Sequence, residues 1–340
     1  MKNIKDSNKP SFFKKIFIKL CRKFGYEIID QNTFEIITTN KKLNEELSLI
    51  GQKSINLPLG EVKITRKIEA LDIIIRTCTS VDMLTQNKKR LFEKEKIEYT
   101  LRTIRSILNS LKDPQLKNLN INFIVIDHNS SNENLSSIKN TFEKFGKKYS
   151  LINLDVSKFK NGIEKINQRG EEVTDNQKSN MANIHQSLIE AKKCKDLIYF
   201  VEDDYIHKKE SLKEMIFTYE RIASQLNKEI IMCPADYPYL YTKSDATQNF
   251  LGQNYHWRKV NETLCTFLTS RKIVEKHWNK FISMCEKEHA PFEKPLHDIY
   301  EKELCLSPIP SLAMHATNIN SSYGIPPNFD WKKNWEDNKI

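Results

Sequence analysis

The chain has 340 residues, of which 39% are hydrophobic and 29% are charged, and its formal net charge is +10 at pH 7. This composition excludes an intrinsically disordered protein and allows one large domain or two smaller ones. Seven cysteines without a CxxC pair or zinc-site spacing exclude a disulfide framework and a structural zinc site, which favours a reducing compartment. Because the sequence shows neither an apolar run of roughly 20 residues nor a signal-peptide pattern, we expect no spanning helix and no secretion.

The first 24 residues carry most of the positive charge, with eight basic residues against one acidic residue. Their net charge is +7, which leaves +3 for the rest of the chain. In SFFKKIFIKLCRKF (residues 11–24), apolar residues recur at helical spacing on one side and basic residues lie largely on the other. This pattern is typical of a helix on an anionic membrane surface; the alternative is a helix that docks its apolar face on the main domain. No nucleic-acid partner is expected, because no recognition motif accompanies the charge elsewhere.

The polar residues after this segment indicate a connector, so we expect an N-terminal segment of residues 1–66, a main domain of residues 67–317 and a C-terminal tail or lid of residues 318–340. The main domain opens with LDIIIRTCTS (71–80), which predicts a buried strand. A helix with one apolar face follows within residues 93–112.

The same scheme then repeats along the chain. INFIVIDHNSSNENL (121–135) predicts a strand that ends at Asp127, a turn and a helix. SLINLDVS (150–157) predicts a shorter strand before a helix at residues 180–193, and LIYFVEDDY (197–205) predicts the next strand. Alternating strands and helices of these lengths predict an α/β fold with a mostly parallel sheet flanked by helices. Ligands of such sheets bind beyond the carboxyl ends of the strands.

Three consecutive acidic residues end the last of these strands, namely Glu202, Asp203 and Asp204. Side chains two positions apart share one side of a strand, so Glu202 and Asp204 are expected to project together. Clustered carboxylates can hold a hard divalent cation that bridges the phosphates of a nucleotide. The alternative is a solvated turn that caps the helix expected near Ser211.

The order of the strand-end motifs RTCTS, VIDHNSS and VEDD resembles that of the GT-A nucleotide-sugar glycosyltransferases, over roughly residues 68–317. The resemblance implies a GT-A (Rossmann-like) fold, a nucleotide-sugar donor, and Mn²⁺ or Mg²⁺ bound at the EDD variant of the DxD motif. It also implies roles for particular residues: the metal ligands would be Asp204 and His315, and the donor contacts would be Arg76, Thr77, Asp127, Asn183, Glu202 and Asp203. From the residues alone, Asp127 can equally be a turn residue, Arg76 a solvated strand end and His315 an ordinary hydrogen-bonded histidine.

The second half of the chain supplies candidate acceptor contacts in two aromatic segments, EIIMCPADYPYLY (229–241) and NYHWRKV (254–260). Aromatic faces stack on sugar rings, although tyrosine and tryptophan also commonly fill cores. The candidate acceptor residues are Asp236, Tyr237, Tyr239, Trp257 and Arg258.

A catalytic base is predicted in APFEKPLHDIY (290–300). Asp298 matches the carboxylate near the start of a late helix that removes the acceptor proton in inverting GT-A enzymes. Glu293 and Asp236 are rival bases, and Asp298 can also be a first-turn acid favoured by the helix dipole.

The sequence therefore predicts a metal-dependent glycosyltransferase that is cytoplasmic and peripheral on the inner face of the cell membrane. Its acceptor would be a glycan or glycolipid in surface polysaccharide or lipopolysaccharide biosynthesis. One alternative is a nucleotidyltransferase of similar fold, which would need a Gly-rich phosphate loop that RTCTS lacks. The other is a basic membrane- or nucleic-acid-binding module without catalysis.

Overall fold

The computed structural model describes residues 12–26, 28, 62–81, 89–242, 244 and 246–339, and the chain divides into two units, residues 1–62 and 63–340. The described part of the first unit contains helix α1 (Phe12–Lys23), which confirms the predicted helix. Residues 1–11 and most of the predicted connector lie outside the described residues. None of the described helices is long and apolar enough to span a bilayer.

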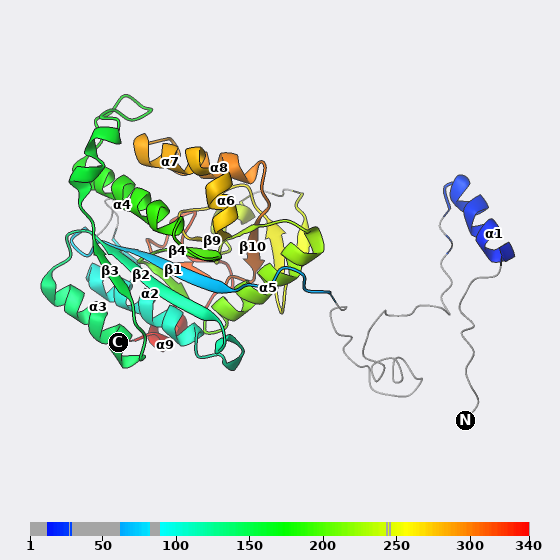
Figure 1. Cartoon of the computed structure of the whole chain (residues 1–340), viewed down its shortest axis with the longest axis horizontal. Coiled ribbons are helices and arrows are strands. Elements are labelled where there is room, and N and C mark those ends of the chain that lie inside the picture. Colours follow the sequence, from blue (N-terminus) through cyan, green and yellow to red (C-terminus); the bar gives the residue numbers. More distant parts are fainter. Residues whose placement is uncertain are drawn as a thin grey trace. The chain divides into compact units, whose positions relative to one another are not determined.

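The second unit is built on a nine-stranded sheet and a separate two-stranded sheet (Figure 1). Its strands are β1 (Ala70–Thr77), β2 (Asn120–Asp127), β3 (Ser150–Asn153), β4 (Leu197–Glu202), β5 (Tyr205–His207), β6 (Ile231–Met232), β7 (Asn249–Leu251), β8 (His256–Lys259), β9 (Phe267–Ser270), β10 (Cys305–Ile309) and β11 (Ala313–His315). The order in the large sheet is β3-β2-β1-β4-β9-β6-β10-β8-β7, and β11 pairs with β5.

Helices cover both faces of the large sheet, with α2, α3 and α5 on one face and α4, α6 and α7 on the other (Figure 1). Their bounds in the second unit are α2 (Lys96–Ser110), α3 (Asn132–Lys144), α4 (Asp175–Ala191), α5 (Ser211–Leu226), α6 (Arg271–Lys276), α7 (Trp278–Glu286), α8 (Lys294–Tyr300) and α9 (Trp331–Asp337). This arrangement confirms the predicted α/β class with helices on both faces.

The parallel part of the sheet consists of β3, β2, β1 and β4, so the carboxyl ends of these strands meet at one edge. In this register Thr77 is paired with Asp127, and Arg76 with Glu202. The other half of the sheet is mixed, because β9 runs antiparallel to β4 and β6 while β10 is parallel to β6. The strand-end motifs of the sequence are thus brought side by side.

Burial on both sides explains the apolar run of the central strands. All eight residues of β1 are buried, since α2 packs on one face of the sheet and α4 on the other. A strand enclosed in this way can present polar groups only at its ends. The polar ends of β1, β2 and β4 therefore define where a ligand could reach this sheet.

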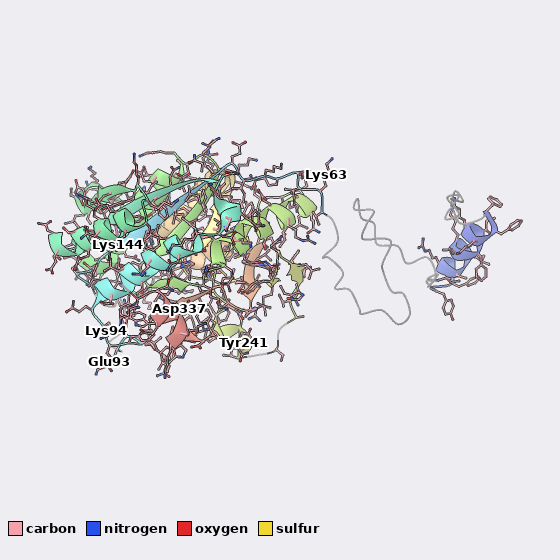
Figure 2. The ribbon with its side chains drawn as sticks, turned by 90° about the horizontal axis from the view of Figure 1, so that it is seen from below. Lys63, Glu93, Lys94, Lys144, Tyr241 and Asp337 are labelled. Atoms are coloured by element: carbon pink, nitrogen blue, oxygen red, sulfur yellow. The ribbon has the colours of Figure 1, made fainter. Side chains whose placement is uncertain are left out.

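The C-terminal residues belong to the second unit and pack beside α2. The ring of Trp335 on α9 stacks on Phe92 with 3.8 Å between ring centroids, and the Arg102 guanidinium lies 4.1 Å from the centre of the same tryptophan ring. Figure 2 shows the side chains, with Lys144 at the end of α3 and Asp337 at the end of α9. Residues 331–337 are thus anchored by aromatic stacking, and this contact holds the loop that leads into α2.

Candidate active site

A cavity of about 740 Å³ lies at the carboxyl ends of β1, β2 and β4. Its walls also include the start of α4, the segment between α7 and α8, and residues that follow β11. Glu202, Asp203 and Asp204 all line this cavity, which is where the sequence places the ligand site of a sheet of this class. A volume of this size falls within the range of small-molecule and cofactor pockets.

Glu202 closes β4 and is held by Arg76 on β1 and by Thr266, which directly precedes β9. Its Oε1 accepts a hydrogen bond from the Arg76 guanidinium at 3.0 Å, and its Oε2 accepts one from the Thr266 hydroxyl at 3.2 Å. The second guanidinium nitrogen of Arg76 donates to Asn180 Oδ1 at 2.9 Å. Arg76 is therefore a buried ion-pair partner and not a solvated strand end, and both members of the pair face the cavity.

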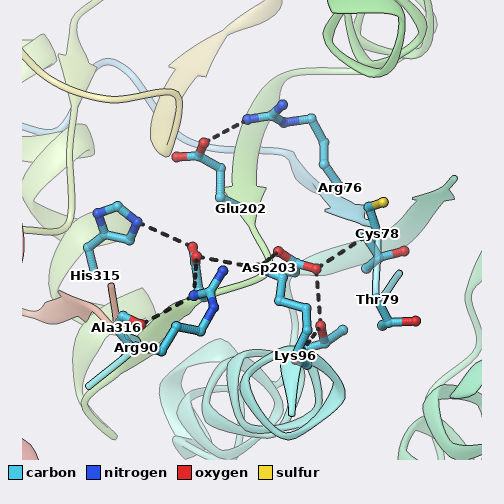
Figure 3. A network of polar contacts seen from close by, with 12 residues as sticks. Arg76, Cys78, Thr79, Arg90, Lys96, Glu202, Asp203, His315 and Ala316 are labelled. Carbon is cyan, nitrogen blue, oxygen red and sulfur yellow. Dashed lines mark hydrogen bonds and ion pairs between the residues drawn. The ribbon is translucent and has the colours of Figure 1, made fainter. Parts of the chain in front are cut away.

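Asp203 and Asp204 are each bound by cationic side chains (Figure 3). Lys96 Nζ lies 2.6 Å from Asp203 Oδ1 and 3.3 Å from Asp204 Oδ2, and Arg90 Nη1 lies 3.0 Å from Asp204 Oδ2. Asp203 Oδ2 also accepts hydrogen bonds from the Thr100 hydroxyl at 3.0 Å and from the Cys78 amide at 3.3 Å. We call Arg90, Lys96, Asp203 and Asp204 the ion quartet.

Burial alone would raise the pKa of Asp204, but the charges of Lys96, His315 and Arg90 outweigh it and hold the pKa well below its ordinary value. The converse holds for Lys96: burial would lower its pKa, yet Asp203 and Asp204 keep the pKa above the usual value. Lys96 and Asp204 therefore each hold the other in its charged form.

His315 faces the opposite carboxylate oxygen of Asp204. Its Nε2 lies 3.4 Å from Asp204 Oδ1, and its Nδ1 donates to the backbone carbonyl of Tyr323 at 3.0 Å. Burial would lower the pKa of His315, but the nearby Asp204 carboxylate raises it above the usual value. The structure thus brings together the two residues that the sequence analysis assigned to a metal.

This pair fits a divalent cation. Two ligand atoms at about 2.1 Å from one ion, placed at right angles, are about 3 Å apart, which is close to the 3.4 Å between Asp204 Oδ1 and His315 Nε2. A carbonyl that receives the Nδ1 proton fixes the imidazole so that Nε2, once it gives up its proton, can ligate, as metal-bound histidines require. Within the described part of the chain no group of three or more His, Cys, Asp or Glu side chains could hold a metal, so the remaining ligands would come from a bound substrate or water.

Of the donor residues predicted near the ends of β1 and β2, some line the cavity and one does not. Thr77 and Asn183 line the cavity, but the carboxylate of Asp127 does not. Asp127 accepts hydrogen bonds from the Thr77 hydroxyl at 2.6 Å, from the Ser130 hydroxyl at 2.6 Å and from the Ser130 amide at 3.1 Å. Of the two alternatives that the sequence left open, the turn role is the one that these contacts support.

Asn183 projects from α4 onto the end of β2. Its Nδ2 donates to the carbonyl of Ile126 at 3.2 Å, whereas its buried Oδ1 has no partner within the described residues. Because a carbonyl only accepts, this contact fixes the orientation of the amide.

The two carboxylates proposed as bases around α8 occupy different places. Asp298 does not line the cavity; it forms ion pairs with Lys280 and Lys294, both at 2.8 Å, and these lysines lower its pKa to about 2. Glu293 does line the cavity, and burial, with the neighbouring charge of Glu202, raises its pKa to about 7. The geometry therefore favours Glu293 over Asp298 as the catalytic base.

The predicted acceptor residues are not brought to the cavity either. Tyr237 and Trp257 are fully buried in the main core, and Asp236 forms a buried ion pair with Arg258. The Tyr239 hydroxyl donates to the carbonyl of Glu262. None of these five described side chains lines the cavity. The structure therefore does not support their role as acceptor contacts.

Arg90 and Lys96 are site residues that sequence reasoning missed. They belong to KRLFEKEK (89–96), whose alternating charges read as an exposed segment before α2. Only Lys96, at the first position of α2, carries a usable signal, because a helix that begins at the carboxyl edge of a parallel sheet points its first side chains toward the ligand site.

No family model matches the chain, and no curated protein matches it either. Solved structures that resemble it are distant. TarS 1–349 of S. aureus in complex with UDP is 12% identical with a TM-score of 0.35, over 64% of this chain and 55% of that chain. The galactosyltransferase LgtC in complex with donor and acceptor sugar analogs is 14% identical with a TM-score of 0.36, over 67% of this chain and 66% of that chain.

Mouse xyloside xylosyltransferase 1 is 10% identical with a TM-score of 0.35, over 68% of this chain and 76% of that chain. In a longer TarS structure the match spans only 29% of that chain. The function proposed below rests on the site and not on these distant likenesses.

Proposed function

We propose that this chain is a GT-A glycosyltransferase that binds a nucleotide-sugar donor together with Mn²⁺ or Mg²⁺ at the edge of the parallel half-sheet. One observation carries the proposal: three consecutive carboxylates at the end of β4 face a cavity of about 740 Å³, and the last of them, Asp204, lies opposite His315. Arg76, Thr77, Asn183, Glu202 and Asp203 line the same cavity and would form its donor side.

The reaction would break the bond between the anomeric carbon and the diphosphate and form a bond from that carbon to an acceptor oxygen. When bound, the cation supplies charge stabilisation for the departing diphosphate. Asp204 and His315 would hold the cation, and Arg76 would keep Glu202 oriented toward the donor. The acceptor would be a hydroxyl of a glycan or glycolipid.

In an inverting transfer, Glu293 is the residue that we assign as the general base in place of Asp298. Its carboxylate would accept the acceptor proton as the new bond forms. A base needs a pKa near the working pH, and burial gives Glu293 a pKa of about 7. Asp298 lacks this property, because two lysines stabilise its charged form outside the cavity.

We also propose that residues 1–24 attach the enzyme to the anionic inner face of the cell membrane. Within its own unit α1 leaves its large apolar side chains uncovered, with Phe13 81% and Phe17 57% accessible, and none of the helix residues is buried. Basic residues share the same helix, including Arg22 and Lys23 in its last turn. An exposed apolar face combined with basic residues is the pattern of an interfacial helix.

The direct test is calorimetric titration of the protein with UDP, GDP and CDP, in MnCl₂ and in EDTA. We expect one diphosphate to bind in MnCl₂, and Asp204→Asn to lose that binding while Asp298→Asn keeps it. The diphosphate that binds then selects the nucleotide sugars whose hydrolysis is assayed. Absence of binding by all three in a folded protein would overturn the proposal.

A further inference from the structure

The ion quartet places two buried cations where a metal site would ordinarily have only negative charge. The side chains of Arg90 and Lys96 are 5% and 9% exposed, and both line the cavity. Together they balance the two carboxylates of Asp203 and Asp204. The neighbouring Glu202 is in turn balanced by Arg76 at 3.0 Å. Figure 3 shows Arg76 beside Glu202 and Lys96 beside Asp203.

We propose that the ion quartet makes metal binding dependent on the nucleotide: the site takes up Mn²⁺ only together with a nucleoside diphosphate, and Lys96 and Arg90 enforce this order. The inference rests on the proposed function and concerns how the same site is assembled. Lys96 and Arg90 act in it as positioning residues, since they fix Asp204 Oδ2 and leave Oδ1 directed at His315.

The physical reason is the balance of charge and ligands. A free divalent cation must give up water, and a site compensates that loss with negative charge and with several oxygen ligands. Here Lys96 and Arg90 already balance the charges of Asp203 and Asp204, and the two candidate ligand atoms that face one another are Asp204 Oδ1 and His315 Nε2. A nucleoside diphosphate brings both missing parts, namely negative charge and phosphate oxygens. Since the coupling is reciprocal, Mn²⁺ must raise nucleotide affinity by the same factor.

The chain offers a closely matched control for the charge of Lys96. Lys94 lies two positions earlier, and its exposed side chain is labelled at the edge of the molecule in Figure 2. Lys94→Met therefore removes the same charge from the same segment without touching the ion quartet. Lys96→Arg is the second control, because it keeps a positive charge beside both carboxylates.

The experiment measures Mn²⁺ binding by electron paramagnetic resonance, with MnCl₂ alone and with MnCl₂ plus UDP or GDP. For the unchanged protein we expect affinity for Mn²⁺ to be at least roughly 10-fold higher with the nucleotide that binds. Lys96→Met should bind Mn²⁺ without nucleotide, and Mn²⁺ alone should raise its melting temperature. Lys94→Met and Lys96→Arg should behave like the unchanged protein, and Arg90→Gln should behave like Lys96→Met.

Two results would overturn the inference. The first is equal Mn²⁺ affinity of the unchanged protein with and without a nucleotide that binds. The second is a folded Lys96→Met or Arg90→Gln protein that gains no affinity for Mn²⁺ alone. A protein that binds no nucleotide at all contradicts the proposed function instead, and the nucleotide-free comparison of Lys96→Met with Lys94→Met still decides whether the quartet suppresses metal binding.

Discussion

Asp204 and His315 face one another across a strand pair, although they are far apart in the chain. Asp204 directly precedes β5 and His315 ends β11, and the antiparallel register of these strands pairs Tyr205 with His315. The ring of Tyr205 stacks on the His315 imidazole with 4.7 Å between centroids, and this contact holds the imidazole in place. The 3.4 Å separation of Asp204 Oδ1 and His315 Nε2 is thus set by a sheet and by a stacked ring.

Replacing His315 should weaken the metal site specifically. With His315→Ala we expect the Mn²⁺ concentration needed for nucleotide binding to rise about 10- to 100-fold, because a metal ligand is lost, and excess Mn²⁺ should partly restore binding. The measurement is UDP or GDP affinity as a function of MnCl₂ concentration. His256→Ala is the control, since His256 is exposed on β8. An unchanged Mn²⁺ requirement in folded His315→Ala would remove His315 from the site.

Glu293→Gln should lower transfer while leaving nucleotide binding near normal. Gln keeps the size of the side chain but cannot accept the acceptor proton, so we expect hydrolysis or transfer to fall about 100-fold or more. Rates and nucleotide affinities of Glu293→Gln and Asp298→Asn are measured side by side. If Asp298→Asn is the variant that loses turnover, the base is Asp298.

The pH profile gives an independent test of the same residue. The folded-state pKa of Glu293 is about 7, raised by burial and by Glu202 from an ordinary value of 4.5. Only the carboxylate form is a base, so turnover should decline as the pH falls through about 7. The same raised pKa means that the folded chain holds this proton more tightly than the unfolded chain does. Its contribution to stability is therefore lost between about pH 4.5 and pH 7 as the pH rises, and Glu293→Gln should flatten that decline.

Asp298 should contribute to stability and not to turnover. Lys280 and Lys294 lower its pKa to about 2 from 3.8, so its ion pairs stabilise the fold above pH 4 and this stabilisation is lost as the pH falls toward 2. The pairs are partly exposed, which limits Asp298→Asn to a loss of about 0.5 to 1 kcal/mol at pH 7. Urea unfolding at pH 7 and at low pH measures both effects, and an equal loss at the two pH values would contradict the assignment.

The strands and the acidic motif could be predicted from the sequence because their signals are local. The apolar run before Glu202 and the one before Asp127 each encode a buried strand with a polar end, and parallel pairing then sets those ends side by side. The partners of the carboxylates could not be predicted, because Arg90 and Lys96 stand in a segment whose charges look like any exposed segment.

The positions of the aromatic residues chosen as acceptor contacts could not be predicted for a related reason. Tyr237 and Trp257 could each lie in the core or at the edge of the cavity, depending on which other segments pack against them. The local sequence pattern does not contain this information. The same limit separates Glu293 from Asp298, since only the fold shows which carboxylate the cavity reaches and which one the lysines hold.

Trp257 should matter for folding and not for substrate. Its side chain is fully buried, and its Nε1 donates to Glu214 Oε1 at 3.3 Å, a carboxylate that also accepts from the backbone amides of Gln253 and Asn254. Trp257→Ala should therefore lower the free energy of unfolding by about 3 to 5 kcal/mol. Urea unfolding measures the loss, and nucleotide affinity of the folded fraction should be unchanged. A stable Trp257→Ala protein with altered sugar transfer would restore Trp257 as an acceptor residue.

Removal of residues 1–24 should abolish attachment to anionic membranes and leave nucleotide binding unchanged, since the cavity belongs to the second unit. Each basic residue near an anionic surface contributes about 1 kcal/mol, and this attraction is screened by salt, so binding should weaken at high ionic strength.

The apolar face must contribute as well, so Phe17→Asp, which places a charge on an exposed apolar position of α1, should weaken binding even at low salt. The measurement is co-sedimentation with phosphatidylglycerol-containing vesicles, with pure phosphatidylcholine vesicles as the control. Equal co-sedimentation of the full chain and the shortened chain would show that the helix has another role. Binding that does not change with salt concentration but is lost in Phe17→Asp would assign the attachment to the apolar face alone.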